Sequence, residues 1–199
     1  MLITNEFEVA APVEAVWRFF DDIPHVAACL PGAELTENLG DDAYKGRVSI
    51  RMGPVRLRFA GTADIVERDN DARRIVVNAA GADEAGRGQA AMTVTAALSR
   101  SGANGTKVGV TQDLQISGAA AQYGRGMISD VSSVLMRDFA VNLADGIARV
   151  QRGESLDSGA PAASQASGLA IGLRAAMMAL RRVFRRFFLP YQPSQPSPS

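Results

Sequence analysis

Residue types that commonly perform chemistry are few in this sequence. It has one histidine, His25, and one cysteine, Cys29, spaced so that a short helix would place them on one face. Neither has a base or nucleophile partner visible in the sequence, and a single cysteine with a single histidine excludes the usual zinc sites. There is no Ser-His-Asp set and no phosphate-binding loop. The sequence therefore predicts no catalytic residue, no metal site and no enzymatic activity.

Two polar residues stand out because apolar positions surround them. Gln112 occupies an inward-facing position of a predicted strand, between Val110 and Leu114, and Tyr123 lies at the start of a predicted long helix. A buried amide or phenol needs a hydrogen-bond partner, which an oxygen atom of a ligand can supply. A backbone carbonyl or a water molecule is the commoner partner for either residue taken alone.

A long helix is predicted over residues 118–150, with its firm part starting near Met127 because Gly124 and Gly126 weaken the first turns. Apolar residues recur along it at spacings of three and four, which places them on one stripe. The stripe consists of Ile128, Val131, Leu135, Phe139, Leu143, Ile147 and Val150.

The chain before this helix is predicted to form a strand at 2–9, two short helices at 12–21 and 25–30, and then six strands. Apolar and polar residues alternate in these strands, expected at 33–38, 43–52, 55–68, 74–80, 89–99 and 106–117. Alternation of this kind is typical of an antiparallel sheet with one solvated face. We therefore predict an α+β fold in which a curved antiparallel sheet wraps around the long C-terminal helix.

The space between sheet and helix is predicted to be hollow. Small residues occupy facing positions (Gly46, Gly61, Ala63, Ala90 and Ala96), and several methionines suit an adaptable wall. An ordinary filled core is the alternative. The predicted ligand-binding residues are Met52, Leu57, Phe59, Met92, Gln112, Leu114, Tyr123, Met127, Val131, Leu135 and Phe139.

Charge is divided unevenly along the 199 residues. Residues 1–150 carry 15 Lys/Arg and 19 Asp/Glu, a net charge of −4, whereas residues 151–199 carry six Arg and two acids, a net charge of +4. The acidic body argues against nucleic acid as a partner, and the basic tail favours an anionic surface. The N-terminus lacks the apolar run of a signal peptide, so we expect a cytoplasmic protein. The expected domains are 1–152 (folded), 153–168 (flexible linker), 169–189 (amphipathic helix) and 190–199 (disordered).

The tail segment 169–189 combines an apolar side with an arginine side at helical spacing. Five arginines, at about 2.5–3.5 kcal/mol each near a bilayer centre, disfavour a membrane-spanning helix. A helix lying in the membrane surface fits better, and docking on a partner protein is the alternative. The predicted membrane-binding residues are Arg174, Leu180, Arg181, Arg182, Phe184, Arg185, Arg186, Phe187 and Phe188.

Several motifs resemble the G-subunit family of carbon monoxide dehydrogenase over about residues 1–150, within the START-like or helix-grip superfamily. They are Pro12, Trp17, Asp21, Asp22, the block Val26-Ala-Ala-Cys-Leu-Pro-Gly-Ala33, and the helix start from Gly118 through Gln122-Tyr-Gly124 to Ile128, with Phe139. The resemblance implies an accessory protein of a molybdenum-containing carbon monoxide dehydrogenase, or of a related molybdenum hydroxylase, acting at the inner face of the cell membrane.

We infer in addition that the hollow carries a lipophilic molecule such as a respiratory quinone, since electrons from carbon monoxide must reach a membrane chain. No covalent cofactor is expected. Two other functions stay open: a pure recruitment adaptor with a filled core, and a small cyclase- or dehydratase-like enzyme of the same superfamily, which would need a buried acid–base pair.

The tail predicts membrane binding that is both electrostatic and hydrophobic. Changing Arg181, Arg182, Arg185 and Arg186 to Gln is expected to weaken binding to anionic vesicles at about 0.1 M salt, at roughly 1 kcal/mol per arginine. Changing Phe184 and Phe187 to Ser is expected to weaken binding to anionic and neutral vesicles alike, because these rings bury area that salt barely affects. Co-sedimentation across a salt series measures both effects, and a wild-type protein that stays in the supernatant throughout would contradict the prediction.

Overall fold

The computed structural model describes residues 1–154. The amphipathic helix and the end segment predicted from the sequence, together with most of the predicted linker, lie outside the described residues.

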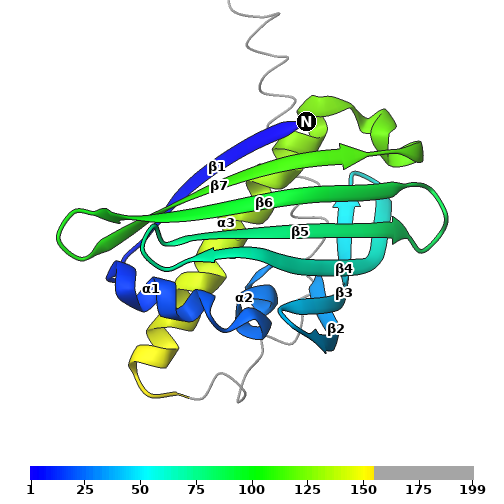
Figure 1. Ribbon diagram of the computed structural model, residues 1–199. Helices are drawn as coiled ribbons and strands as arrows, with labels where there is room; N and C mark the ends of the chain where they lie inside the picture. The colour runs from blue at the N-terminus through cyan, green and yellow to red at the C-terminus, as the bar shows by residue number, and fades with distance from the viewer. Residues whose placement is uncertain (155–199) are drawn as a thin grey trace, which may run out of the picture.

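Seven strands form one antiparallel sheet in the order β1-β7-β6-β5-β4-β3-β2 (Figure 1). Short hairpins make neighbours in sequence neighbours in the sheet, and β1 alone pairs with a distant strand, β7. The strands are β1 (Leu2–Val9), β2 (Ala33–Gly40), β3 (Ala43–Met52), β4 (Val55–Asp69), β5 (Arg74–Asp83), β6 (Gln89–Ser101) and β7 (Gly105–Ile116).

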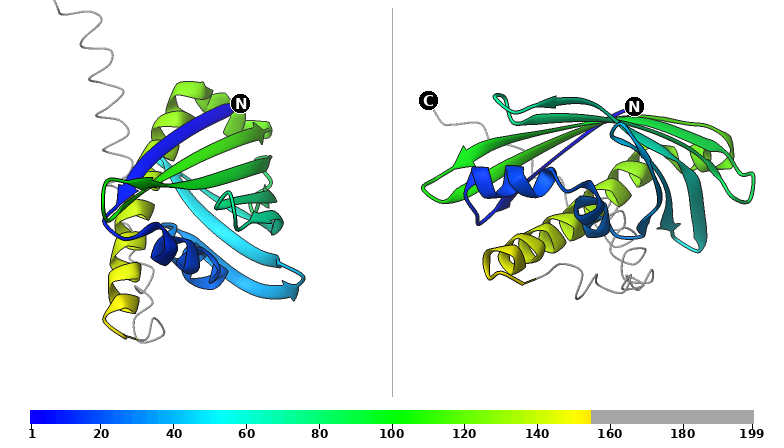
Figure 2. Two further views of the ribbon diagram at one scale, coloured as in Figure 1. Left: turned by 60° about the vertical axis from the view of Figure 1, so that its left-hand side comes forward. Right: turned by 60° about the horizontal axis from the view of Figure 1, so that its bottom comes forward.

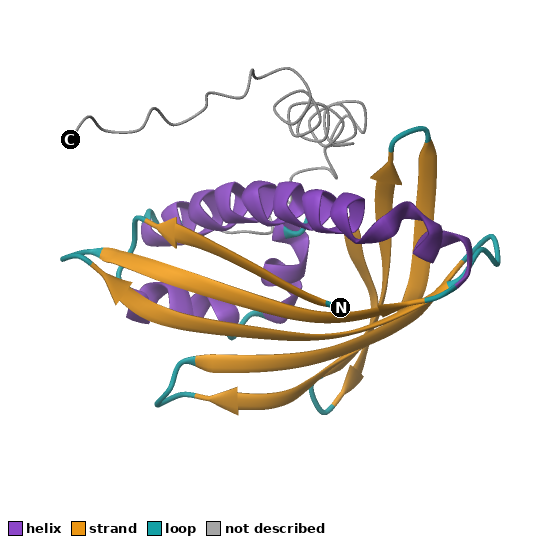
Figure 3. Cartoon of the chain, turned by 90° about the horizontal axis from the view of Figure 1, so that it is seen from above, coloured by secondary structure: helices purple, strands orange, loops and turns teal. Residues whose placement is uncertain are grey.

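The sheet curves strongly where β4 meets β5. Gly61 lies opposite Gly81, and a Cβ atom on Gly61 would come within 1.9 Å of the Ala80 carbonyl oxygen. Two opposed glycines therefore allow a backbone approach that no other residue permits. This pairing also explains why β5 continues to Asp83 rather than ending at Ala80 as predicted: Gly81 belongs to the ladder and does not begin a loop. Seen from above, the strands curl around one side of a helix (Figure 3).

That helix is α3 (Gly124–Gln151), which follows a 3-10 turn, η1 (Gly118–Tyr123), and lies across the concave side of the sheet (Figure 2). The predicted stripe is confirmed at Ile128, Val131, Phe139, Leu143 and Ile147, all buried, and Leu135 is half-buried. Val150 is the exception: its side chain is 48% exposed, because the last turn of α3 runs past the sheet (Figure 1). No helix within residues 1–154 combines the length and the apolar character needed to cross a membrane.

Two short helices, α1 (Val13–Phe20) and α2 (Ile23–Cys29), cover the other end of the concave face. Helix α2 begins two residues earlier than predicted because Asp22 caps it, its carboxylate accepting the His25 backbone N–H at 3.3 Å. Proline at the second helical position, Pro24, costs no hydrogen bond there, since the first helical N–H groups have no partner within the helix.

Apolar side chains form two clusters, one toward each end of α3. The first joins α1 and α2 to Phe139, Leu143 and Ile147 of α3. The second joins Ile128 and Val131 to the β3–β4 hairpin. Near the middle of the helix, Leu135 packs against the second cluster and Met136 against the first.

The first cluster predicts a large cost for removing its central side chain. Leu143 is completely buried, so Leu143→Ala is expected to lower the free energy of unfolding by about 2–5 kcal/mol. Val141, on the same helix but 57% exposed, provides the control, and Val141→Ala is expected to change stability by less than about 1 kcal/mol. Urea unfolding at constant pH measures both, and equal losses would contradict this packing.

Candidate functional site: an apolar cavity under the sheet

A cavity of about 470 Å³ lies between the concave face of the sheet and α3. This volume falls within the range of about 300–1,000 Å³ that is usual for small-molecule sites. Side chains from six strands (β1 and β3–β7), from α1, α2 and α3, and from the start of β2 contribute to its wall.

The hollow exists because the sheet presents short side chains at several positions of the cavity wall. The five small residues singled out in the sequence, Gly46, Gly61, Ala63, Ala90 and Ala96, all line the cavity. A methyl group or a hydrogen atom is too small to fill the space between sheet and helix that larger side chains fill elsewhere. The predicted hollow is therefore present.

Most of the predicted ligand-binding residues line this cavity, although their contact with a ligand stays a prediction. Those on the wall are Met52, Leu57, Phe59, Met92, Gln112, Leu114, Val131, Leu135 and Phe139. Two lie elsewhere. Met127 is 42% exposed, because the neighbouring Ile128 takes the inward-facing position and one residue turns a helix by about 100°. Tyr123 ends η1 and packs against the second cluster.

The contribution of α1 and α2 to the wall was missed in the sequence. Phe20 of α1 and Ile23, Val26 and Leu30 in and just after α2 face the cavity. The spacing of three and four between the last three residues is the signal that predicts such a face.

One buried polar network faces the cavity. The Asn5 amide donates to the Ser132 hydroxyl at 3.2 Å, and that hydroxyl donates to Oε1 of Gln112 at 3.0 Å. Gln112 is only 8% exposed, and both Gln112 and Ser132 belong to the wall. Because the single Ser132 proton is used on Oε1, the Nε2 group of Gln112 is left with two N–H donors and has no hydrogen-bond partner among residues 1–154. An apolar cavity with one such donor suits a lipophilic molecule that carries an oxygen acceptor.

The titratable side chains of the wall lie toward β2 and β3. Glu34 and Arg47 are exposed, and Arg47 forms an ion pair of 3.3 Å with Glu84, whereas Tyr44 is buried.

Cys29 is buried in the first cluster, where desolvation raises the pKa of its thiol to about 11. Nδ1 of His25 lies 2.6 Å from the Asp22 carboxylate. Within residues 1–154 no three His, Cys, Asp or Glu side chains gather as a metal site would require.

A curved antiparallel sheet closed by a long helix over an apolar cavity defines a helix-grip protein. The sequence matches the model of one family in particular, the carbon monoxide dehydrogenase G-subunit (CoxG) family, over residues 6–148, and the chain belongs to this family. A search of curated protein sequences finds no match.

Solved structures share the fold at low sequence identity. A conserved protein from Geobacillus kaustophilus is 21% identical, with a TM-score of 0.67 over 75% of this chain and 96% of its own. The ZhuI aromatase/cyclase from Streptomyces sp. R1128 is 16% identical, with a TM-score of 0.57 over 78% and 99%. A norcoclaurine synthase from Thalictrum flavum is 14% identical, with a TM-score of 0.53 over 76% and 96%. These likenesses show a common architecture.

Outside the cavity, the loop between β5 and β6 contains an ion pair that the sequence analysis did not predict. The Asp83 carboxylate is completely buried and accepts from Nε and Nη2 of Arg87 at 2.7 and 2.9 Å. It also accepts the backbone N–H groups of Arg58, Ala85 and Arg87. The Arg87 guanidinium, followed by these N–H groups, holds the pKa of Asp83 far below its usual value. We call this arrangement the Asp83 clamp.

The clamp predicts a pH-dependent contribution to stability. An aspartate whose pKa is lowered by folding stabilises the protein above its unfolded pKa of about 3.9, and this contribution is lost as the pH falls below that value. Asp83→Asn is therefore expected to unfold at lower urea concentration than wild type near pH 7, with the difference narrowing between about pH 4 and pH 3. Asp64→Asn, on the exposed face of β4, serves as the control and is expected to have little effect. A difference that stays constant down to about pH 3 would show that the charge of Asp83 is irrelevant.

Proposed function

We propose that this protein is a non-enzymatic accessory protein of a molybdenum-containing carbon monoxide dehydrogenase, and that it carries a lipophilic molecule in its cavity. Membership of the CoxG family supports the association with the dehydrogenase. The observation that carries the second part is a cavity of about 470 Å³ with an apolar wall and a free amide donor on Gln112.

The chemistry of the wall favours a ligand with one polar end. Gln112 offers N–H donors, so the polar end needs an acceptor such as a carbonyl oxygen, while Met92, Leu114 and Leu135 contact an apolar ring or chain. A respiratory quinone meets both requirements, and it would connect the oxidation of carbon monoxide to a membrane electron-transport chain.

The tail supplies the proposed link to the membrane. Residues 169–189 have the amphipathic, arginine-rich pattern of a helix that lies in an anionic membrane surface. With a linker over 153–168, this segment would hold the folded domain, and the dehydrogenase bound to it, at the inner face of the cytoplasmic membrane.

Mass spectrometry of an organic extract tests the carrier function. Full-length protein purified from a quinone-producing bacterium is expected to release a lipophilic molecule with at least one acceptor oxygen. Ala90→Phe places a ring in the cavity and is expected to reduce the extracted amount several-fold, whereas Ala91→Phe, one residue along β6 on the exposed face, leaves it unchanged. Gln112→Leu keeps the volume and removes the donor, which corresponds to roughly a 2- to 10-fold loss of affinity for one hydrogen bond.

The same experiment separates the alternatives. An extract without any such molecule from correctly folded wild-type protein would favour a pure recruitment adaptor. An extract that contains a molecule chemically converted by the protein would favour an enzyme of the cyclase or dehydratase type.

A further inference from the structure

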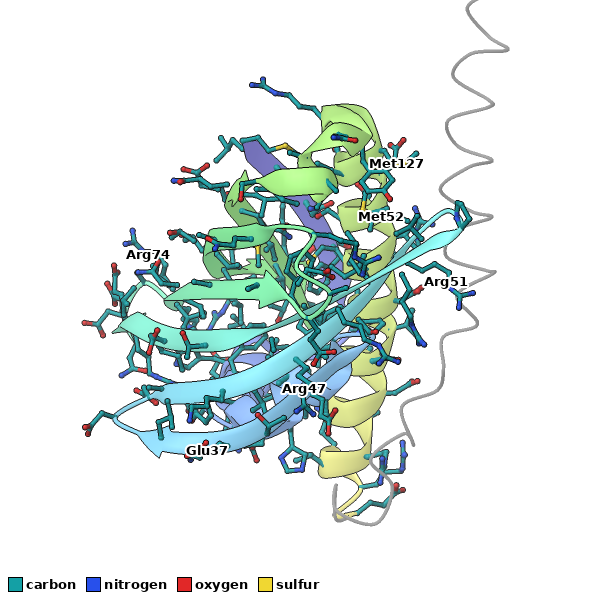
Figure 4. The ribbon with its side chains drawn as sticks, turned by 90° about the vertical axis from the view of Figure 1, so that its right-hand side faces the viewer. Glu37, Arg47, Arg51, Met52, Arg74 and Met127 are labelled. Atoms are coloured by element: carbon teal, nitrogen blue, oxygen red, sulfur yellow. The ribbon has the colours of Figure 1, made fainter. Side chains whose placement is uncertain are left out.

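The β3–β4 hairpin concentrates positive charge in a domain that is acidic as a whole. Residues 43–63 contain five Lys/Arg and no Asp or Glu, although residues 1–150 carry a net charge of −4. The alternation of the two strands separates two faces. Ile50, Met52 and Leu57 line the cavity, while the intervening side chains point to the outer face, where Figure 4 shows Arg47 and Arg51 directed away from the sheet.

Three arginines near the tip of this hairpin have no acidic partner among residues 1–154. Arg51 lies directly opposite Arg56 in the ladder, and Arg58 follows two residues further along the same face of β4. Lys45 and Arg47 pair with Glu37 and Glu84 at 2.8 and 3.3 Å, but within the described part of the chain no carboxylate pairs with Arg51, Arg56 or Arg58. Like charges directly opposite each other destabilise a sheet. Arg51 and Arg56 therefore repel each other, and an external anion bound between the arginines would offset this repulsion.

The Asp83 clamp holds this arginine group in place. The ladder between β4 and β5 begins only at Phe59, so the hairpin end lacks a neighbouring strand on that side. Instead, Arg58 donates its N–H to Asp83 and accepts from the Glu84 N–H at 2.7 Å, and Nη2 of Arg87 donates to the Arg56 carbonyl oxygen at 2.7 Å. The clamp therefore replaces the missing strand and fixes the backbone from which Arg56 and Arg58 project.

Apolar residues accompany the arginines at the same end of the molecule. The turn at Gly53-Pro54 is exposed and Val55 is half-buried. Met127 is 42% exposed, and its neighbour Ile128 belongs to the same apolar cluster as Met52. Cationic and apolar groups side by side match the boundary of a bilayer, where phosphates lie above acyl chains.

We propose that Arg51, Arg56 and Arg58, with the 52–55 turn and Met127, form a docking surface for anionic phospholipids. We call it the arginine hairpin. Guanidinium groups bind phosphate oxygens in a bidentate manner, which relieves the opposition of Arg51 and Arg56. A bilayer is favoured over an acidic protein because the opposite face of this hairpin is the wall of a cavity suited to lipophilic molecules. The inference rests on the proposed carrier function and adds that the folded domain, independently of its tail, places the outer side of the β3–β4 hairpin against the membrane.

Site-specific fluorescence on the full-length chain tests this orientation. An environment-sensitive fluorophore is attached to Pro54→Cys, at the hairpin tip, or to Ala103→Cys, in the exposed turn at the other end of the sheet. Cys29 is buried, so the introduced cysteine is the reactive thiol. Vesicles contain phosphatidylcholine alone or an equal mixture with phosphatidylglycerol, at about 0.1 M salt. We expect a blue-shifted, brighter signal that lipid-borne quenchers reduce, at position 54 only, and with anionic vesicles only.

Two triple variants that change the net charge equally are compared, one on the hairpin and one, the control, at the far end of the sheet. Combining Arg51→Gln, Arg56→Gln and Arg58→Gln in the Pro54→Cys protein is expected to raise the lipid concentration for half-maximal signal at least tenfold. Combining Arg73→Gln, Arg74→Gln and Arg100→Gln, at the far end of the sheet, is expected to leave it within twofold. Figure 4 shows Arg74 and Arg51 on opposite sides of the molecule.

Several results would overturn the arginine hairpin. The first is a protein that sediments with anionic vesicles while position 54 gives no response, and the second is an equal response from both charge variants. A third is loss of chemical cross-linking to carbon monoxide dehydrogenase in the hairpin variant with an unchanged lipid response, which would make the surface a protein-docking site. None of these results affects the outcome of the extraction experiment, so the carrier function is tested separately.

Discussion

The structure depends on the packing of one long helix against the concave side of a curved sheet, through two apolar clusters. Leu143 and Ile147 are packed at one end of α3, and Ile128 and Val131 at the other. Between them the sheet offers glycine and alanine, and the gap stays open. Hydrophobic burial at two separated clusters thus stabilises a domain that keeps an empty centre. A cavity in such a fold needs only short side chains at some positions of the sheet.

Polar and charged groups are arranged differently in the cavity and on the β3–β4 hairpin. In the cavity, polar groups are few and ordered: Ser132 directs Oε1 of Gln112 away and leaves its N–H groups facing the space. On the β3–β4 hairpin, charge is abundant and unbalanced. The Asp83 clamp belongs to neither site, yet it fixes the backbone of β4, which carries Leu57 and Phe59 toward the cavity and Arg56 and Arg58 away from it.

Strand positions, the faces of strands and the phase of α3 were predictable because each rests on local alternation of residue types. Most residues predicted to bind a ligand line the cavity, and the hollow itself was predicted from the small residues of the sheet together with the family resemblance. Sequence reasoning failed where an outcome depends on tertiary contacts. Nothing near Met127 or Val150 shows that these residues lie outside the packed part of the helix. The pairing of Gln112 with Ser132 joins separate elements, and Asp83 and Arg87 looked like part of an ordinary turn.

The two faces of β4 are tied together by the pleat of the strand. A deletion or insertion of one residue in the β3–β4 turn would exchange them, sending arginines into the cavity and leucine and phenylalanine into water. The length of this turn is therefore constrained by both faces of the strand at once. Substitutions at wall positions can accordingly alter the shape of the cavity without disturbing the outer face, whereas a change in the length of this hairpin alters both faces together.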